Sequence, residues 1–327
     1  MRTSNGIQYP DTIAMAFAPV LFVSTDNDVV RLEVTLTNGE GASVTVSHDA
    51  FGGACYVDMS DYVQGMYGEV SMPEDGTMRK SPTMKMMTYS VRKLTTAWSL
   101  AVDGAQTYFV WGAAARGETW GGNRYYRRSY DMPFTLDLLK LGTQSFQFSG
   151  GGQTASVTAS SVGLWHVPIP QSMQGVERIL VADSLGTAVI VMDDCNDGLV
   201  LRWIDRHGLL VYRAFYKGVR ASEIGNEGEY KRNNLLNWNE DYGWKGMTGA
   251  GWIKKRKDKM TVCAYNVTEE EYAAMQDLAS SPLVEMMAVD DEWMTVSIDA
   301  GTWQKKSAAL QEMEFDVIFD DVPIQRA

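Results

Sequence analysis

Residues 29–46, VVRLEVTLTNGEGASVTV, carry the clearest structural signal in the chain. Apolar residues alternate with polar ones from Val29 to Thr37 and again from Ala42 to Val46. A period of two is that of a β-strand with one buried face. Asn38-Gly39, between the two runs, tolerates the positive φ of a tight hairpin turn. The stretch therefore predicts an antiparallel hairpin whose register is set by its buried face.

The same alternation recurs along most of the chain, in short runs separated by Gly, Pro, Asp and Asn. Asp103-Gly104 predicts a tight turn between two of these runs. Short strands at regular spacing favour a sandwich or a barrel, because an antiparallel meander needs only short connections. The further predicted strands are 54–59, 86–94, 98–102, 107–111, 146–148, 156–160, 177–182, 188–192, 199–205, 210–216, 283–289, 293–298 and 310–319.

The length of 327 residues suggests about two domains. A boundary is expected near residues 165–175, because Pro168 and Pro170 remove two ladder donors and favour extended backbone. The sequence therefore predicts a mainly β fold of two sandwich- or barrel-like domains. The first is an N-terminal β-sandwich of residues 1–165, and the second is a β-rich domain of residues 176–327 with an aromatic insert at 225–252.

One short helix is predicted in the C-terminal half, at about 268–280. Thr268 and Glu271 have the spacing of a capping box, in which each side chain satisfies a backbone amide of the first turn. Ser280-Ser281-Pro282 ends the helical pattern. The apolar stripe of this helix is formed by Tyr272, Met275, Leu278 and Ala279.

Composition narrows the classes of function. There are 29 basic and 41 acidic residues, a net charge of -12, which disfavours binding to nucleic acid or to an anionic membrane. No apolar run reaches the 18 residues that a spanning helix needs, so we expect a soluble protein made in a cytosol. The three cysteines and three histidines are isolated, and no catalytic or phosphate-binding motif is present. We therefore expect no enzyme activity, no cofactor and no metal site.

Aromatic residues in Gly- and Asn-rich segments are the candidate contact residues, because Tyr and Trp dominate interface hot spots and also stack on sugar rings. The alternative is that these segments fold back and cover their own domain. A basic run, Lys254-Lys255-Arg256-Lys257, either docks head-to-tail onto copies of this chain or onto an acidic neighbour, or keeps a solvated edge strand from aggregating. The aromatic candidates are Trp120, Tyr125, Tyr126, Trp238, Tyr242, Trp244 and Trp252.

Acidic residues lie among the aromatic residues of the second half. Two carboxylates beside sugar-stacking rings are all that a glycoside hydrolase needs, so a glycosidase is a further alternative. A solvated loop has the same composition, and 41 acidic residues make coincidental pairs frequent. The carboxylates in question are Glu227, Glu229, Glu240 and Asp241.

The C-terminal half, over residues 175–325, resembles tail and baseplate proteins of tailed bacteriophages and their prophages, most of all the distal-tail or hub group. The resemblance rests on hydrophobic and aromatic patterns: residues 198–208 with Tyr212 and Phe215, the helix 268–280 followed by Ser281-Pro282-Leu283-Val284, Trp293 with Val296 and Ile298, and residues 310–317. The first half resembles only a generic sandwich.

The resemblance implies a non-enzymatic virion protein made in the host bacterial cytoplasm. Such a subunit forms a homo-oligomeric ring at the tail end and joins the tail tube to other tail proteins. It implies no catalytic residues. The alternative function is that of a glycan-binding, lectin-like module for a host-surface glycan.

Overall fold

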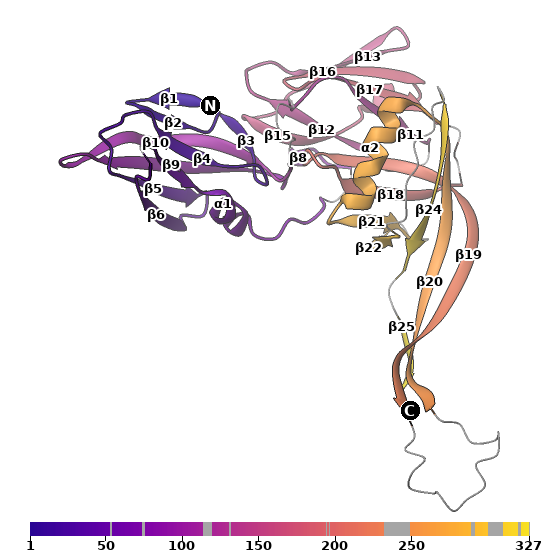
Figure 1. The fold of residues 1–327 in the computed structure, drawn as a ribbon. Helices are drawn as coiled ribbons and strands as arrows, with labels where there is room; N and C mark the ends of the chain where they lie inside the picture. Colours follow the sequence, from indigo (N-terminus) through magenta and orange to yellow (C-terminus); the bar gives the residue numbers. More distant parts are fainter. Residues whose placement is uncertain are drawn as a thin grey trace, which may run out of the picture. The chain divides into compact units, whose positions relative to one another are not determined.

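The structure, a computed structural model, describes residues 1–52, 54–73, 76–113, 120–130, 132–193, 195, 197–231, 249–288, 292–299, 310–319 and 322–326. Over these residues the fold is mainly β, as predicted, with several sheets. The chain forms two compact units. Unit 1 comprises Met1–Asn196 and Arg202–Arg213, and unit 2 comprises Asp197–Leu201 and Ala214–Ala327. Figure 1 shows the elements of each unit.

The N-terminal part of unit 1 is a sandwich of two sheets around one apolar core. Phe22, Leu32 and Tyr89 come from different strands of the two sheets and are fully or almost fully buried in this core. One sheet has the order β1 (Arg2–Ser4), β2 (Ile7–Tyr9), β4 (Leu21–Ser24) and β7 (Cys55–Asp58). The other has the order β3 (Ile13–Met15), β10 (Trp98–Val110), β9 (Met84–Leu94), β5 (Arg31–Asn38) and β6 (Ser43–Asp49).

The hairpin predicted at residues 29–46 is confirmed, since β5 pairs with β6 in antiparallel register. Its turn is longer than the predicted one. Gly41, with φ 87°, and not Gly39 has the left-handed conformation, and the Asn38 amide donates to the Ala42 carbonyl at 2.9 Å. A three-residue loop with a glycine in the left-handed region has this form. The Asn38 side-chain oxygen accepts from the Glu40 and Ala42 amides and holds the loop closed.

The tight turn predicted at Asp103-Gly104 is wrong. Residues 98–110 form one strand, β10, which pairs with β9 on both sides of Asp103. The register shifts between Leu100 and Val102 and again between Val102 and Ala105. A bulge accommodates the extra residues, with Gly104 at φ 57°. An Asp-Gly pair in the sequence is therefore compatible with a bulge as well as with a turn, because both place the glycine at positive φ.

Unit 1 contains two further sheets. Gly151 and Gly152, with φ of 55° and 75°, form the two-residue turn between β13 and β14, a conformation in which both central residues need positive φ. One sheet has the order β11 (Arg124–Arg128), β17 (Gly186–Met192), β16 (Arg178–Asp183), β13 (Phe146–Gly150) and β14 (Gln153–Val157). The other has the order β12 (Thr135–Lys140), β15 (Gly163–Pro168) and β8 (Arg79–Lys80).

The segment expected to be a domain boundary lies inside unit 1. It contains the end of β15 and a short 3-10 helix, η1 (Gln171–Met173). Strands on its two sides pair with each other, since Gln147 of β13 lies opposite Ala182 of β16. The two units therefore divide the chain at places other than residues 165–176.

Unit 2 is built on one large sheet. Phe215 and Phe315 pack edge to face in its core with ring centroids 5.0 Å apart. The sheet has the order β22 (Trp293–Thr295), β21 (Val284–Met287), β18 (Leu199–Ile204), β19 (Leu210–Lys231), β20 (Gly249–Val267), β24 (Gln311–Ile318) and β23 (Ser297–Ile298), with β25 (Val322–Arg326) also paired to β20.

The predicted C-terminal-half helix is confirmed as α2 (Glu269–Ser280), with the Thr268 and Glu271 capping box formed. Tyr272, Met275 and Leu278 of its apolar stripe are buried. A second helix, α1 (Ser60–Tyr67), was not predicted. Its eight residues contain Gly65 and make barely two turns, so the helical period leaves little trace in the sequence.

Candidate functional site

The aromatic segment at residues 120–128, predicted to be an irregular contact loop, contains a strand. Arg124–Arg128 form β11, which pairs in parallel with β17. Tyr126 is buried and packs edge to face on Phe134 at 6.2 Å, and burial raises the pKa of its hydroxyl. Tyr125, the next residue along the strand, is 40% exposed. Of this pair, only Tyr125 has a side chain available to another molecule.

Trp120 lies beside a small apolar cluster of unit 1. It is half-buried and packs against a cluster formed by Leu139, Leu164, Leu185 and Leu209. Its indole N–H is buried and has no hydrogen-bond partner among the described residues. This position agrees with the alternative that such rings cover their own domain.

The second group of candidates is described only in part. Trp238, Tyr242 and Trp244 lie outside the described residues, as do the carboxylates Glu240 and Asp241. The other candidates of residues 225–255 are placed by their backbone alone: Glu227 and Glu229 lie in β19, and Trp252, Lys254 and Lys255 lie in β20.

The basic run lies in a strand that has neighbours on both sides. Arg256 lies opposite Ile224 of β19 and opposite Val322 of β25, so β20 is not an edge strand at this position. The Arg256 guanidinium also forms a two-point ion pair with Asp258, with both N–O distances 2.6 Å. Lys257 is exposed and lies opposite Glu223. Acidic neighbours on the same sheet therefore already offset part of this basic charge.

β19 and β20 pair in a long antiparallel ribbon (Figure 1), and part of β19 is exposed although no pattern in the sequence indicates this. Nine consecutive residues of β19, Tyr216–Ile224, are all exposed. Among them Val219 is 71% exposed and Ile224 is 63% exposed. Because successive side chains of a strand point to opposite faces, both faces of this segment meet solvent. β18 has six residues against the 22 of β19, so most of β19 has only β20 beside it among the described strands.

An aromatic pair with acidic neighbours lies near the start of this ribbon. Tyr216 and Tyr265 are both partly exposed, and their ring centroids are 5.2 Å apart. Glu312 and Glu314 on β24 are exposed, and Glu314 lies opposite Cys263 of β20. The hydrogen bond with Cys263 and the nearby negative charges raise the pKa of the Tyr265 hydroxyl. This part of the sheet therefore combines exposed rings with net negative charge.

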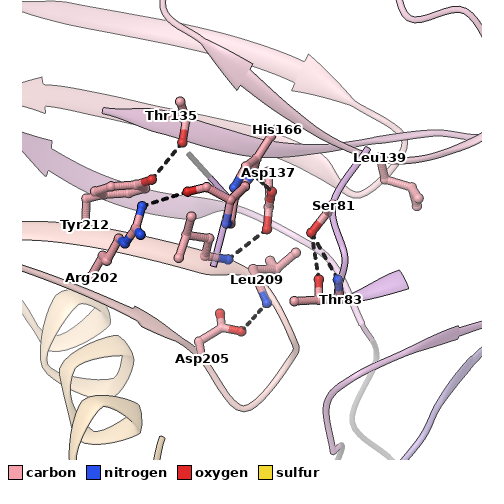
Figure 2. A network of polar contacts seen from close by, with 12 residues as sticks. Ser81, Thr83, Thr135, Asp137, Leu139, His166, Arg202, Asp205, Leu209 and Tyr212 are labelled. Carbon is pink, nitrogen blue, oxygen red and sulfur yellow. Dashed lines mark hydrogen bonds and ion pairs between the residues drawn. The ribbon is translucent and has the colours of Figure 1, made fainter. Parts of the chain in front are cut away.

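A buried polar network lies in the interior of unit 1 (Figure 2). Asp137 on β12 and His166 on β15 are cross-strand partners, and their side chains are hydrogen-bonded. The other carboxylate oxygen of Asp137 accepts the Leu210 backbone amide at 2.8 Å. Nearby, Thr135 Oγ1 and the Tyr212 hydroxyl lie 3.0 Å apart. Side-chain hydrogen bonds therefore connect β12, which pairs with β15, to β19 of a different sheet.

The Asp137–His166 pair has the residue types of a general-base pair, in which the carboxylate orients the imidazole. However, Asp137 is 0% exposed and His166 is 1% exposed. The imidazole Nε2 is buried and has no hydrogen-bond partner among the described residues. A general base must reach the proton that it abstracts, directly or through one water. In this structure the pair acts as a structural contact and not as a site open to substrate.

Two features are absent from the described part of the chain. It contains no cluster of three or more His, Cys, Asp or Glu side chains that could hold a metal ion. None of its helices has the length and apolarity needed to cross a membrane.

Comparisons with known proteins identify no family for this chain. No protein-family model matches the chain, and no curated protein matches its sequence. Among solved structures, the chain is similar to the crystal structure of the periplasmic chaperone SfaE, with 13% sequence identity and a TM-score of 0.21. The match covers 57% of this chain and 100% of the chaperone chain. At this TM-score the likeness carries no argument about function.

Proposed function

We propose that this chain is a non-enzymatic structural subunit of a bacteriophage tail or baseplate. It assembles into an oligomeric ring and joins the tail tube to distal components. It is made in the cytoplasm of the host bacterium and acts in the virion. The class of particle rests on the resemblance of residues 175–325 to distal-tail and hub proteins. The assembly mode rests on the exposed segment of β19.

The observation that carries the proposal is the exposure of Tyr216–Ile224 on both faces. A long edge strand presents unpaired backbone donors and acceptors, which another chain can pair with. Val219 and Ile224 add apolar side chains that gain roughly 25 cal/mol per Å² when a neighbour covers them. An isolated ribbon of this kind is marginally stable in water. Contact with a neighbouring subunit would both stabilise β19 and hold the assembly together.

Size-exclusion chromatography with light scattering tests the proposal on the purified full chain, alone and mixed with neighbouring tail proteins. We expect an oligomer, or a complex with at least one of those proteins. A variant with Val219→Asp and Ile224→Asp should shift the distribution toward monomer, because both substitutions place charge on the proposed contact.

The matched control is Leu100→Asp, which places the same charge at a 53% exposed apolar position of β10 in unit 1. It should leave the assembly unchanged. A wild-type chain that stays monomeric and binds none of the neighbouring tail proteins contradicts the proposal. Equal assembly of the wild type and the β19 variant contradicts the role of β19.

The glycan-binding alternative depends on rings of which Trp238 and Trp244 lie outside the described residues. A glycan array tests it directly. Binding that is lost in Trp238→Ala and Trp244→Ala would favour this function, whereas an array without hits would remove it.

A further inference from the structure

A groove of about 700 Å³ lies on unit 1 beside the end of β11 and the segment 168–174. Its walls combine polar groups with apolar side chains, among them Met132, Phe134 and Ile169. Tyr130, at the rim, is 56% exposed. Grooves of this volume, with apolar walls and a few placed polar groups, are typical of small-molecule sites.

Among the described residues that line this groove, Arg128 is charged, and its side chain is 6% exposed. Its Nη2 donates to the backbone carbonyls of Met173, at 3.3 Å, and Gln174. Its Nε is buried and has no hydrogen-bond partner among the described residues. Its Nη1 donates no hydrogen bond to any described residue. Nε and Nη1 of the guanidinium are therefore without an acceptor among the described residues.

No carboxylate among the described residues forms an ion pair with Arg128. Burial lowers the pKa of this guanidinium, because the charged form loses hydration. By contrast, Arg124 on the same strand pairs with Asp183 at 2.7 Å. A buried cation is normally paired with an anion, because its desolvation is otherwise uncompensated. An external anion would supply the missing partner.

We propose that this groove binds a small organic carboxylate. The guanidinium of Arg128 holds the carboxylate group by its charge and by a charge-assisted hydrogen bond from Nη1, the nitrogen that is neither bonded to a carbonyl nor buried. The apolar body of the ligand lies along Met132, Phe134 and Ile169. Because these three side chains offer no hydrogen-bond partners, an acid with an aliphatic body fits along them better than a hydroxylated sugar acid. This site is separate from the exposed segment of β19 and does not depend on its role in assembly.

Isothermal titration calorimetry of the full chain with sodium octanoate tests the proposal. We expect saturable binding, weaker by tenfold or more in Arg128→Met and partly retained in Arg128→Lys, which keeps the charge. Octan-1-ol, which has the same tail without the carboxylate, and D-glucuronate, which has the carboxylate without the tail, should each bind at least tenfold more weakly. Arg178→Met, at an exposed arginine that does not line the groove, is the matched control and should bind as the wild type does.

Absence of octanoate binding to the wild type at millimolar concentration would overturn the proposal. So would equal binding by Arg128→Met, provided circular dichroism shows that the variant is folded. If that variant does not fold, octanoate and octan-1-ol are compared on the wild type, and equal affinities reject a role for the carboxylate. Equal affinity for glucuronate and octanoate rejects the apolar part of the site.

Discussion

β5 and β19 are both strands with alternating side chains, but the two differ in what covers them. β5 lies between β6 and β9, and Leu32, Val34 and Leu36 are all 0% exposed. The Tyr216–Ile224 segment of β19 is exposed on both faces, including its apolar Val219. The comparison shows that an apolar residue in a strand need not serve the folding of its own chain. In β5 it builds the core, whereas in β19 it is available to a partner.

The largest expected effect is that of truncating β5. Leu32→Ala should lower the free energy of unfolding by about 2–5 kcal/mol, because the buried side chain leaves a cavity in the sandwich core. Urea denaturation followed by fluorescence measures this change. Leu100→Ala, at an exposed position of β10, is the control and should change it by less than about 0.5 kcal/mol. Similar effects of the two substitutions would contradict the assignment of β5 to the core.

The next effect comes from the buried polar network of unit 1. Asp137→Ala removes the acceptor of the Leu210 amide and the partner of His166. The free energy of unfolding should fall by about 1–3 kcal/mol, because a buried donor is left without an acceptor. Denaturation of this variant is compared with that of Asp28→Ala, which removes an exposed carboxylate. If Asp137→Ala unfolds at the same urea concentration as Asp28→Ala, the network does not stabilise unit 1.

A smaller effect on stability is expected from a substitution in the exposed segment of β19. Val219→Ala should change the stability of the monomeric chain by less than about 0.5 kcal/mol, because no described residue buries this side chain. The measurement is denaturation at a concentration low enough to keep the chain monomeric. A loss of several kcal/mol would mean that Val219 supports its own fold, which would remove the contrast with β5.

The smallest effect is a pH dependence in unit 2. Hydrogen bonds from Thr261, at 2.6 Å, and from Lys259 lower the pKa of Asp316. The lowered pKa adds stability above about pH 4, the ordinary range of an aspartate, and this stability is lost as the pH falls through the pKa of the folded state. Urea midpoints between pH 2.5 and 7 should therefore vary less in Asp316→Asn than in the wild type. An unchanged pH profile in this variant would show that the carboxylate does not contribute.

The local features of the fold could be predicted because each depends on neighbours in sequence. The β5–β6 hairpin follows from alternation, and α2 follows from the spacing of Thr268 and Glu271. Asp103-Gly104 was misassigned because an Asp-Gly pair favours the left-handed conformation in a bulge and in a turn alike. Whether the chain reverses there depends on the partner strand β9, which local sequence does not specify.

The candidate sites could be predicted less well. Tyr125 and Tyr126 were expected in one contact loop, but the alternation of β11 exposes one and buries the other. Asp137 and His166 are 29 positions apart and meet only because β12 and β15 pair in one register. The exposure of Val219 could not be predicted from its sequence, because an apolar residue in a strand is usually covered.

By itself, the amino-acid sequence determined the β character of this chain, the position of the β5–β6 hairpin and the start of α2. These features depend on side-chain periodicity and on hydrogen bonds between residues a few positions apart. Only the tertiary structure decided which strands lie beside one another and which faces remain uncovered. It placed the Arg128 guanidinium beside the Met173 and Gln174 carbonyls without a carboxylate partner among the described residues, and it left Tyr216–Ile224 open to solvent. Such properties depend on contacts between distant segments, and no local pattern encodes them.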